Sequence, residues 1–515
     1  MLVPFKNEPI TDFSVKENRE AMEKAIKYVE GQLGREYPLF IGGEEIKTER
    51  QIISVNPADH SEVVGYLSKA DKDQANKAVE AADKAFETWS KYPARMRAEY
   101  LFKTAAILRR RKLEFSAWMV IEESKPWVEA VADTAEAIDF LDFYARQMIE
   151  LDQPRELYRI PDEDNEVKYI PLGVGLCIPP WNFPLAIMCG ITVAAIVAGN
   201  PVVLKPASAA GVIAAKFVEV LREVELPAGV INFVPGSGSE IGDLLVEHPR
   251  TRFISFTGSK EVGLRIHELA AKVNPGQIWL KRVVAEMGGK DAILVDDSVF
   301  DFDDMIDGIV SGAFGFQGQK CSACSRLIVH KDMYDKVLEA VLEKTKELKV
   351  GDPRDLGNHM GAVIEQGAYN KITEYVKIGM NEGELQFGGE YSDKKGYFVH
   401  PTVIEVDPDA RIANEEIFGP VLAVIRAESF EEGLEIVNNT EYGLTGAVYS
   451  TYREHIQRAK EEFHVGNLYF NRKCTAALVG VHPFGGFNMS GTDSKAGGFD
   501  YLQLFTQQKL VSEYM

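Results

Sequence analysis

Residues 173–205 have the sequence GVGLCIPPWNFPLAIMCGITVAAIVAGNPVVLK. The apolar run that ends at Ile178 predicts a buried strand, residues 185–198 predict an apolar helix, and residues 201–204 predict a second strand. Short apolar strands separated by helices are typical of a parallel sheet with helices on both faces. Because such sheets bind ligands at the carboxyl ends of their strands, the loops that follow these two strands are candidate sites.

The same alternation continues along the chain. We expect further helices at residues 209–223, 240–247 and 260–272, with strands at residues 230–234 and 253–256. A second α/β unit is predicted to begin at residue 292, with a strand at residues 292–295, helices at residues 302–313 and 333–348, and strands near Val403 and at residues 421–425. The predicted fold class is therefore α/β.

The sequence before this region predicts a polar helix at residues 14–33, a strand-rich stretch at residues 38–66, and helices at residues 71–89, 93–122 and 129–151. Residues 157–171 are charged and loosely alternating, which favours a hairpin that projects from the body. Residues 502–511 favour a closing strand. If the two pair, they would form an interface for oligomer formation.

Composition excludes several function classes. The chain has 515 residues, enough for two or three domains, and a formal charge of −21. This charge disfavours nucleic acid and anionic membrane surfaces as partners. The N-terminus has no apolar segment typical of a secretory signal. The five cysteines include a pair at Cys321 and Cys324, but no second pair or histidine cluster completes a metal site. We expect no metal and a reducing, cytoplasmic compartment.

Two glycine-framed motifs carry the chemistry. Gly318-Gln319-Lys320-Cys321-Ser322 presents a cysteine, whose thiolate can attack a carbonyl and form a covalent intermediate. Glu286-Met287-Gly288-Gly289-Lys290 presents a carboxylate that can activate a water molecule. Glycines allow the backbone to approach a substrate closely.

Three strand ends add candidate binding groups. The prolines of Pro179-Pro180-Trp181-Asn182-Phe183-Pro184 would hold the Asn182 amide rigidly, as a developing oxyanion requires. Lys205 can reach a ribose hydroxyl or a phosphate, and Phe256-Thr257-Gly258-Ser259 opens a helix that suits a pyrophosphate. The nearest glycine-rich match, residues 236–242, is GxGxxxG and departs from the common dinucleotide fingerprint.

These pieces together resemble the aldehyde dehydrogenase superfamily over nearly the whole chain. Besides the motifs above, the matching blocks are Leu204-Lys205-Pro206, Asn414-Glu415-Glu416-Ile417-Phe418-Gly419-Pro420 and Pro483-Phe484-Gly485-Gly486. The resemblance implies a Rossmann-type cofactor domain, an α/β catalytic domain and a small β oligomerisation element. It places the NAD-binding domain at residues 1–156 and 172–288, the catalytic domain at 289–466, a return segment at 467–487, and the oligomerisation element at 157–171 and 488–515.

The resemblance also implies a role for each matching residue. Cys321 would be the nucleophile, Asn182 and the Cys321 N–H would hold the oxyanion, and Glu286 would activate the hydrolytic water. Cys324 would have no role. The cofactor would be NAD, with NADP also accepted because Ser208 stands where many NAD-preferring relatives carry a glutamate. The implied cofactor contacts are Ile178, Pro179, Trp181, Lys205, Ser208, Gly238, Gly242, Phe256, Thr257, Gly258, Ser259, Gly288, Glu416 and Phe418.

The C-terminal stretch from Asn471 to Tyr501 resembles the subfamily that oxidises L-glutamate γ-semialdehyde, in its form without a fused proline dehydrogenase domain. One departure is Ala476, where that subfamily often has glycine. The implied substrate contacts are Phe183, Lys320, Ser322, Ala476, Ala477 and Phe484. Two alternatives remain open: oxidation of another aldehyde, such as succinate semialdehyde, and a non-catalytic family member. The latter predicts loss of Cys321, Glu286 or Asn182, and all three are present.

Overall fold

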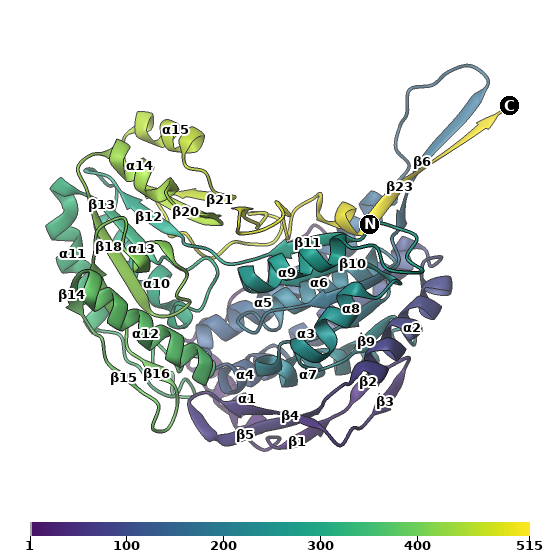
Figure 1. Cartoon of the computed structure of the whole chain (residues 1–515), viewed down its shortest axis with the longest axis horizontal. Coiled ribbons are helices and arrows are strands. Elements are labelled where there is room, and N and C mark those ends of the chain that lie inside the picture. Colours follow the sequence, from purple (N-terminus) through teal and green to yellow (C-terminus); the bar gives the residue numbers. More distant parts are fainter. Residues whose placement is uncertain (1–2) are drawn as a thin grey trace.

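The computed structural model describes residues 3–515. Two seven-stranded sheets organise the chain, one built from strands between residues 39 and 286 and the other from strands between residues 292 and 470. They lie on opposite sides of Figure 1, each with helices packed on it. The α/β class predicted from the alternation of strands and helices is confirmed.

The first sheet has the strand order β11-β10-β7-β8-β9-β2-β3. Strands β7 to β11 pair in parallel with their neighbours, so their carboxyl ends lie along one edge. Strands β2 and β3 extend the sheet in antiparallel pairing. The bounds are β2 Leu39–Ile41, β3 Glu44–Ile46, β7 Val174–Ile178, β8 Val202–Leu204, β9 Ile231–Phe233, β10 Thr251–Thr257 and β11 Arg282–Glu286.

Side chains of this sheet alternate between two cores. In β8, Val202 and Leu204 join the larger core, whereas Val203 joins a smaller core on the other face. Helices cover both faces, which is why these strands are apolar on both sides. The larger core includes α1 Lys16–Glu30, α3 Ala94–Arg110, α4 Lys112–Glu122, α5 Trp127–Leu151, α6 Ala186–Val197 and α7 Gly211–Glu223, and the smaller includes α2 Lys72–Trp89, α8 Asp243–Glu247 and α9 Lys260–Ala271.

The predicted continuous helix at residues 93–122 is wrong, because the chain forms two helices that meet at Arg111. Its backbone leaves the helical region at φ −103° and ψ 20°. Every residue of α4 from Phe115 to Glu122 is buried, whereas α3 keeps one exposed face. The break lets α4 turn into the core while α3 stays at the surface. No proline or glycine marks this position in the sequence.

The second sheet has the order β14-β17-β18-β13-β12-β20-β21, parallel except for the edge strand β14. Its strands are β12 Ala292–Val295, β13 Arg326–His330, β14 Glu384–Phe387, β17 Thr402–Glu405, β18 Val421–Ala427, β20 Thr445–Tyr449 and β21 Asn467–Phe470. Its helices are α10 Phe302–Phe314, α11 Lys331–Lys346, α12 Gln366–Glu382, α13 Arg411–Asn414, α14 Phe430–Asn438 and α15 Arg453–Glu462. Two small sheets accompany it, formed by β15 Tyr391–Ser392 with β16 Phe398–Val399 and by β19 Tyr442–Gly443 with β22 Phe487–Asn488.

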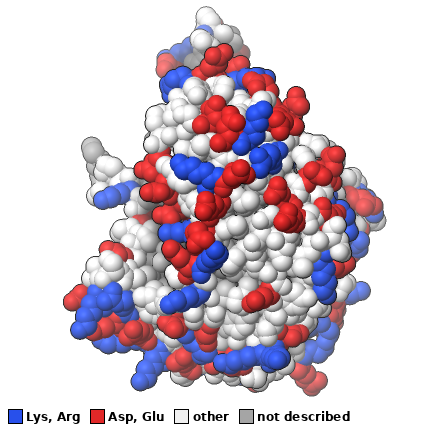
Figure 2. Space-filling view, turned by 90° about the vertical axis from the view of Figure 1, so that its left-hand side faces the viewer, with Lys and Arg blue, Asp and Glu red and all other residues white. Residues whose placement is uncertain are grey.

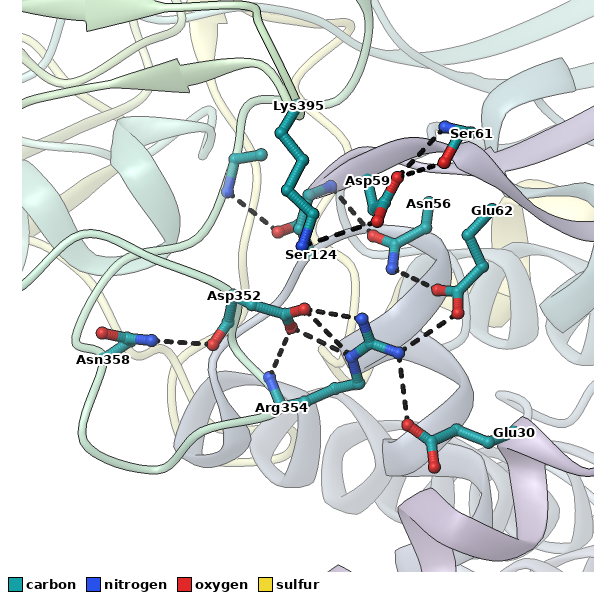
Figure 3. A network of polar contacts seen from close by, with 12 residues as sticks. Glu30, Asn56, Asp59, Ser61, Glu62, Ser124, Asp352, Arg354, Asn358 and Lys395 are labelled. Atoms are coloured by element: carbon teal, nitrogen blue, oxygen red, sulfur yellow. Dashed lines mark hydrogen bonds and ion pairs between the residues drawn. The ribbon is translucent and has the colours of Figure 1, made fainter.

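A polar network ties the second unit to the N-terminal region (Figure 3). Arg354, in the loop after α11, binds Asp352 of its own loop at 2.7 Å. Its Nη1 donates to Glu30 of α1 at 3.2 Å and to Glu62 of β5 at 3.3 Å. Strand β5 (Asp59–Ser68) belongs to a three-stranded sheet with β1 (Arg35–Tyr37) and β4 (Gln51–Asn56). One guanidinium therefore joins three segments that are far apart in the sequence.

An arm projects from the body at the upper right of Figure 1. It consists of β6 (Glu163–Pro171) paired antiparallel with the C-terminal β23 (Thr506–Tyr514). The predicted pairing of these two segments is confirmed, but residues 157–171 do not form a hairpin by themselves, because the partner of β6 is the distant C-terminal strand. The predicted strand at residues 502–511 begins later, since residues Tyr501–Phe505 form a 3-10 turn that packs into the core.

The surface is mixed in charge. On the face shown in Figure 2, acidic and basic side chains are interspersed. Within residues 3–515, no helix has both the length and the apolar character needed to cross a membrane.

Candidate active site

The two sheets bring the predicted site residues together from opposite directions. Residues predicted from the first sheet lie at or after the carboxyl ends of its parallel strands, with Glu286 as the last residue of β11. Those of the second sheet precede the amino ends of β13 and β18, which are parallel neighbours. The first group is Ile178 to Phe183 after β7, Lys205 and Ser208 after β8, Gly238 and Gly242 after β9, and Phe256 to Ser259 at the end of β10; the second is Lys320 to Ser322 before β13 and Glu416 and Phe418 before β18.

A tight left-handed turn presents Cys321. Phe316, Gln317 and Gly318 have φ values of 51°, 57° and 65°, a region that ordinary side chains rarely adopt. A Cβ on Gly318 would lie 2.4 Å from the carbonyl oxygen of Gly419, so the close approach requires glycine. Such strain is typical of functional loops. Cys321 itself is half-buried, and no hydrogen bond within residues 3–515 uses its backbone N–H as the donor.

The Asn182 side chain reaches the same loop. Its Nδ2 donates a 3.0 Å hydrogen bond to the carbonyl oxygen of Gln319, two residues before Cys321. Asn182 is buried. The amide is therefore fixed beside the nucleophile, and its second N–H can serve an oxyanion that forms on a carbon bonded to Cys321.

The surroundings of Cys321 favour the neutral thiol. Burial, followed by the nearby carboxylates of Asp291 and Glu286, raises the pKa of the Cys321 thiol well above its ordinary value.

Glu286 is held by the C-terminal segment. The hydroxyl of Ser494 donates to its Oε1 at 2.5 Å, and the N–H of Gly486 donates to its Oε2 at 3.3 Å. Burial raises the pKa of Glu286 to about 8, and these two hydrogen bonds oppose the shift. A carboxyl group that titrates close to neutral pH suits a general base.

The loop at Ala476 and Ala477 offers free backbone donors. Among the hydrogen bonds of the described residues, none uses the N–H of either alanine. Arg472 stabilises the loop, because it donates to the carbonyl oxygens of Thr475 at 2.7 Å and Ala476 at 3.1 Å. The thiol of Cys474 donates to the Ser322 carbonyl at 3.5 Å, which places this loop against the nucleophile loop. Free N–H groups in such a turn can bind an anion.

The remaining predicted substrate residues are Phe183, Lys320 and Phe484. Phe183 and Phe484 are half-buried. Lys320 is not a free cation, because its ammonium lies 2.7 Å from Glu129 of α5. Its charge is thus largely balanced by that carboxylate.

Comparisons with known proteins agree with this geometry. Residues 45–511 match the model of the aldehyde dehydrogenase family. The chain belongs to the aldehyde dehydrogenase family. It is 62% identical over 514 residues to 1-pyrroline-5-carboxylate dehydrogenase of Geobacillus kaustophilus and 60% identical to that of Bacillus thuringiensis, with all of each chain covered.

Solved structures give the same result. The fold matches a 1-pyrroline-5-carboxylate dehydrogenase from Thermus with bound NAD at a TM-score of 0.98, with 52% identity and full coverage of both chains. The fold also matches proline utilization A from Bdellovibrio bacteriovorus at a TM-score of 0.96 and 43% identity. That match covers 99% of this chain and 53% of the other. The family-level fold inferred from the sequence blocks is therefore confirmed.

The residues expected to bind the family cofactor NAD fit such a ligand. Lys205 is buried, and burial lowers its pKa to about 8. Among residues 3–515, its ammonium donates a hydrogen bond only to the Pro206 carbonyl, at 3.4 Å. A buried ammonium without a carboxylate partner suits a ribose hydroxyl or a phosphate. Ser259 caps α9 by accepting from the Val262 N–H, which leaves a helix N-terminus beside Gly258.

Two further contacts shape the other end of this cofactor region. A Cβ on Gly288 would lie 2.3 Å from Oε1 of Glu416, so glycine is required where that carboxylate sits. The neighbouring Gly289 N–H donates to the same oxygen at 3.0 Å. The rings of Trp181 and Phe418 meet edge to face with centroids 5.6 Å apart.

Sequence reasoning missed three residues that hold the site together. Ser494 binds Glu286, although they are 208 positions apart. Lys125 and Asp133 form a buried ion pair behind Asn182. In the sequence, Lys125 stands directly before a proline, ahead of the helix predicted at residues 129–151, and Asp133 lies on that helix, so nothing local indicates that the two pair.

Proposed function

We propose that this protein oxidises L-glutamate γ-semialdehyde to L-glutamate with NAD, through a thioester on Cys321. This reaction is the second step of proline degradation. The observation that carries the proposal is the meeting of Cys321, Asn182 and Glu286 beside a loop with free backbone N–H groups at Ala476 and Ala477. The full-length relatives named 1-pyrroline-5-carboxylate dehydrogenase support the same substrate.

The first step is addition. The Cys321 sulfur bonds to the aldehyde carbon, the thiol proton leaves, and the carbonyl oxygen becomes an oxyanion. The Cys321 N–H and the free N–H of the Asn182 amide donate to that oxygen. This arrangement favours the tetrahedral intermediate over the planar aldehyde, because the donors are fixed beside the nucleophile before the reaction.

The second step converts the hemithioacetal into a product. Bound NAD supplies the acceptor for the hydride that leaves the former aldehyde carbon. Glu286 then takes a proton from water, which attacks the thioester, and Cys321 leaves as the thiol. One aldehyde and one water yield one carboxylate, two electrons pass to the cofactor as hydride, and the protons are released to solvent.

The substrate preference follows from the free donors. The N–H groups of Ala476 and Ala477, with the buried Ser322, can receive the α-carboxylate of glutamate semialdehyde. An aldehyde without a carboxylate leaves these donors unpaired, which costs a few kcal/mol. The protein therefore favours aldehydes that carry a distal carboxylate.

A substrate panel tests the proposal. NADH formation is followed with L-glutamate γ-semialdehyde, succinate semialdehyde and propanal, and kcat/KM is compared. We expect glutamate semialdehyde to exceed propanal by about three orders of magnitude or more. Equal rates with propanal would contradict the carboxylate anchor, and a clear preference for succinate semialdehyde would identify a different member of the family.

We further infer a homo-oligomer, a dimer or larger. The arm of β6 and β23 exposes Leu510, Val511 and Tyr514 to solvent at 63%, 43% and 80%. Projecting strands with apolar side chains are usually covered by another subunit. Light scattering at micromolar concentration tests this, and a monomer there would contradict it.

The proposed compartment is the reducing cytoplasm. All five cysteines are free in the structure, and four of them are buried. Free thiols, one of them the nucleophile, fit a compartment that keeps cysteines reduced. Cell fractionation with an antibody to the protein tests the assignment, which detection only in an extracellular fraction would contradict.

A further inference from the structure

A single buried ammonium lies behind the oxyanion donor. Lys125 stands between α4 and α5, and its side chain is completely buried. Its Nζ donates to Oδ2 of Asp133 at 2.6 Å and to the backbone carbonyl oxygen of Asn182 at 2.7 Å. The other oxygen of Asp133 accepts the N–H of Ala186, the first residue of α6. Lys125 thus holds the loop at Asn182 itself, and Asp133 holds the start of the helix that follows it.

The same ammonium also faces the nucleophile loop. It lies 4.3 Å from the ring centre of Phe183 and 4.5 Å from that of Phe316, distances at which a cation is attracted to an aromatic face. Phe316 is the first of the left-handed residues that present Cys321. Lys125 therefore contacts the loop of the oxyanion donor and the loop of the nucleophile at once.

The neighbouring residue strengthens this link. Ser124 has a left-handed backbone, with φ 54°, and its carbonyl oxygen accepts from Nε2 of Gln317 at 3.0 Å. Its hydroxyl accepts the N–H of Ala362 at 2.8 Å. The segment from Ser124 to Lys125 consequently joins the cofactor-side unit to the catalytic loop through contacts that are almost fully shielded from water.

We propose that Lys125 is a positioning residue that fixes the Asn182 amide relative to Cys321. The inference rests on the proposed function, in which Asn182 stabilises the oxyanion. Asn182 is held at its carbonyl by Lys125 and at its side chain by Gln319, and the ammonium is the only cation that binds that carbonyl among the described residues. Without it, Asn182 loses one of these two contacts. A displacement of about 1 Å can reduce a rate about a hundredfold.

A double-mutant cycle separates this role from general support of the core. Lys125→Met is made in the wild-type protein and in the Asn182→Ala protein, and kcat/KM with L-glutamate γ-semialdehyde is measured for all four. If Lys125 acts through Asn182, its replacement lowers kcat/KM about tenfold to a hundredfold in the wild type, but by no more than about twofold once Asn182 is alanine. NAD affinity should stay within about twofold in every variant.

Lys216→Met is a matched control. Lys216 is also buried and also lies over two aromatic rings, Tyr37 at 5.2 Å and Trp118 at 5.4 Å, but it contacts neither active-site loop. Its replacement should change kcat/KM by no more than about twofold in both backgrounds. A comparable loss with Lys216→Met would show that the assay reports core disruption, and the proposal would fall.

The outcomes are distinguishable. An equal loss from Lys125→Met in both backgrounds overturns the positioning role while the proposed function stands. Full activity of Asn182→Ala overturns the oxyanion assignment itself. If Lys125→Met does not fold because Asp133 is left as a lone buried charge, the variant with both Lys125→Met and Asp133→Asn removes both charges. The same non-additivity with Asn182→Ala is then expected, and additivity overturns the proposal.

Discussion

The hydroxyl of Ser494 donates a 2.5 Å hydrogen bond to Oε1 of Glu286. This donor favours the ionised carboxylate, whereas burial favours the neutral acid and raises the pKa of Glu286 to about 8. Below this pH, most molecules of the free protein carry a protonated Glu286 that cannot accept a proton from water. The rate of thioester hydrolysis should therefore rise as the pH increases through about 8.

Replacing Ser494 with alanine should move this pH dependence. Loss of a hydrogen bond to the charged form raises the pKa of Glu286 further, by about one unit. The midpoint of kcat against pH should shift to higher pH by the same amount when hydrolysis limits the rate. Ser490→Ala is the control, because the buried hydroxyl of Ser490 accepts from Gly443 and does not bind Glu286. A shift with both variants, or with neither, would contradict the assignment.

The two cysteines of the CxxC pair should behave differently. Cys321→Ala should abolish oxidation and leave NAD affinity nearly intact, because the thiolate is needed for covalent capture only. Cys324→Ala should retain activity, since Cys324 is buried in an apolar core and its thiol binds the Arg326 carbonyl. Steady-state NADH formation and NAD titration measure both effects. Substantial turnover by the Cys321→Ala protein would show that Cys321 is not the nucleophile.

The left-handed backbone of Ala476 should lower the free energy of unfolding of the protein. Its φ is 66°, a left-handed value that costs a non-glycine residue about 1–2 kcal/mol. Glycine relieves that strain but loses about 0.5–1 kcal/mol through the greater freedom of the unfolded chain. Ala476→Gly should therefore be neutral or stabilise by up to about 1.5 kcal/mol, whereas Ala477→Gly, at a position without positive φ, should destabilise. Denaturant unfolding compares them, and destabilisation of equal size by both would contradict this reading.

Cofactor choice should depend on Ser208 and on pH. Ser208 is exposed directly after the loop of Lys205 and presents no carboxylate to repel a 2′-phosphate. We expect NADP to be accepted with kcat/KM within about tenfold of NAD. Ser208→Glu should depress NADP use far more than NAD use.

Lys205 supplies the pH dependence of this choice. Because its pKa is about 8, its positive charge is present at lower pH and is lost as the pH rises past that value. The NADP-to-NAD ratio of kcat/KM should therefore fall as the pH rises, because the charge that pairs with the 2′-phosphate is lost. A ratio that neither the mutation nor the pH alters would show that another group selects the cofactor.

Much of the fold could be predicted because its signals are local. The strands β7, β8 and β10 and the helices between them follow from short apolar runs and helical periodicity, and Asp71 caps α2 with a capping box close to the predicted start. The break at Arg111 could not be predicted, since it results from the packing of α4 and no local residue demands it. The pairing of β6 with the C-terminal segment could be predicted because residues 502–511 favour a closing strand.

The site residues also fall into two groups, those that the sequence predicts and those that only the structure shows. Cys321, Glu286 and Asn182 stand in motifs that can be recognised in the sequence, and the structure brings them to facing edges of the two sheets. Ser494 and Lys125 act across long sequence separations, so their partners follow only from the three-dimensional fold. The left-handed backbone of Phe316 and Gln317 could not be predicted either, because neither residue is a glycine that would indicate a positive φ.

In the proposed mechanism, Cys321 carries the glutamyl group as a thioester, and water activated by Glu286 hydrolyses it. Glu286→Gln keeps an oxygen that can accept from Ser494 but removes the base. The variant is mixed with NAD and L-glutamate γ-semialdehyde, quenched in acid within seconds, and analysed by mass spectrometry of its peptides. We predict one NADH formed rapidly per active site and a glutamyl adduct on the peptide that contains Cys321. Rapid NADH formation without this adduct, or an adduct on another residue, would contradict this role of Cys321.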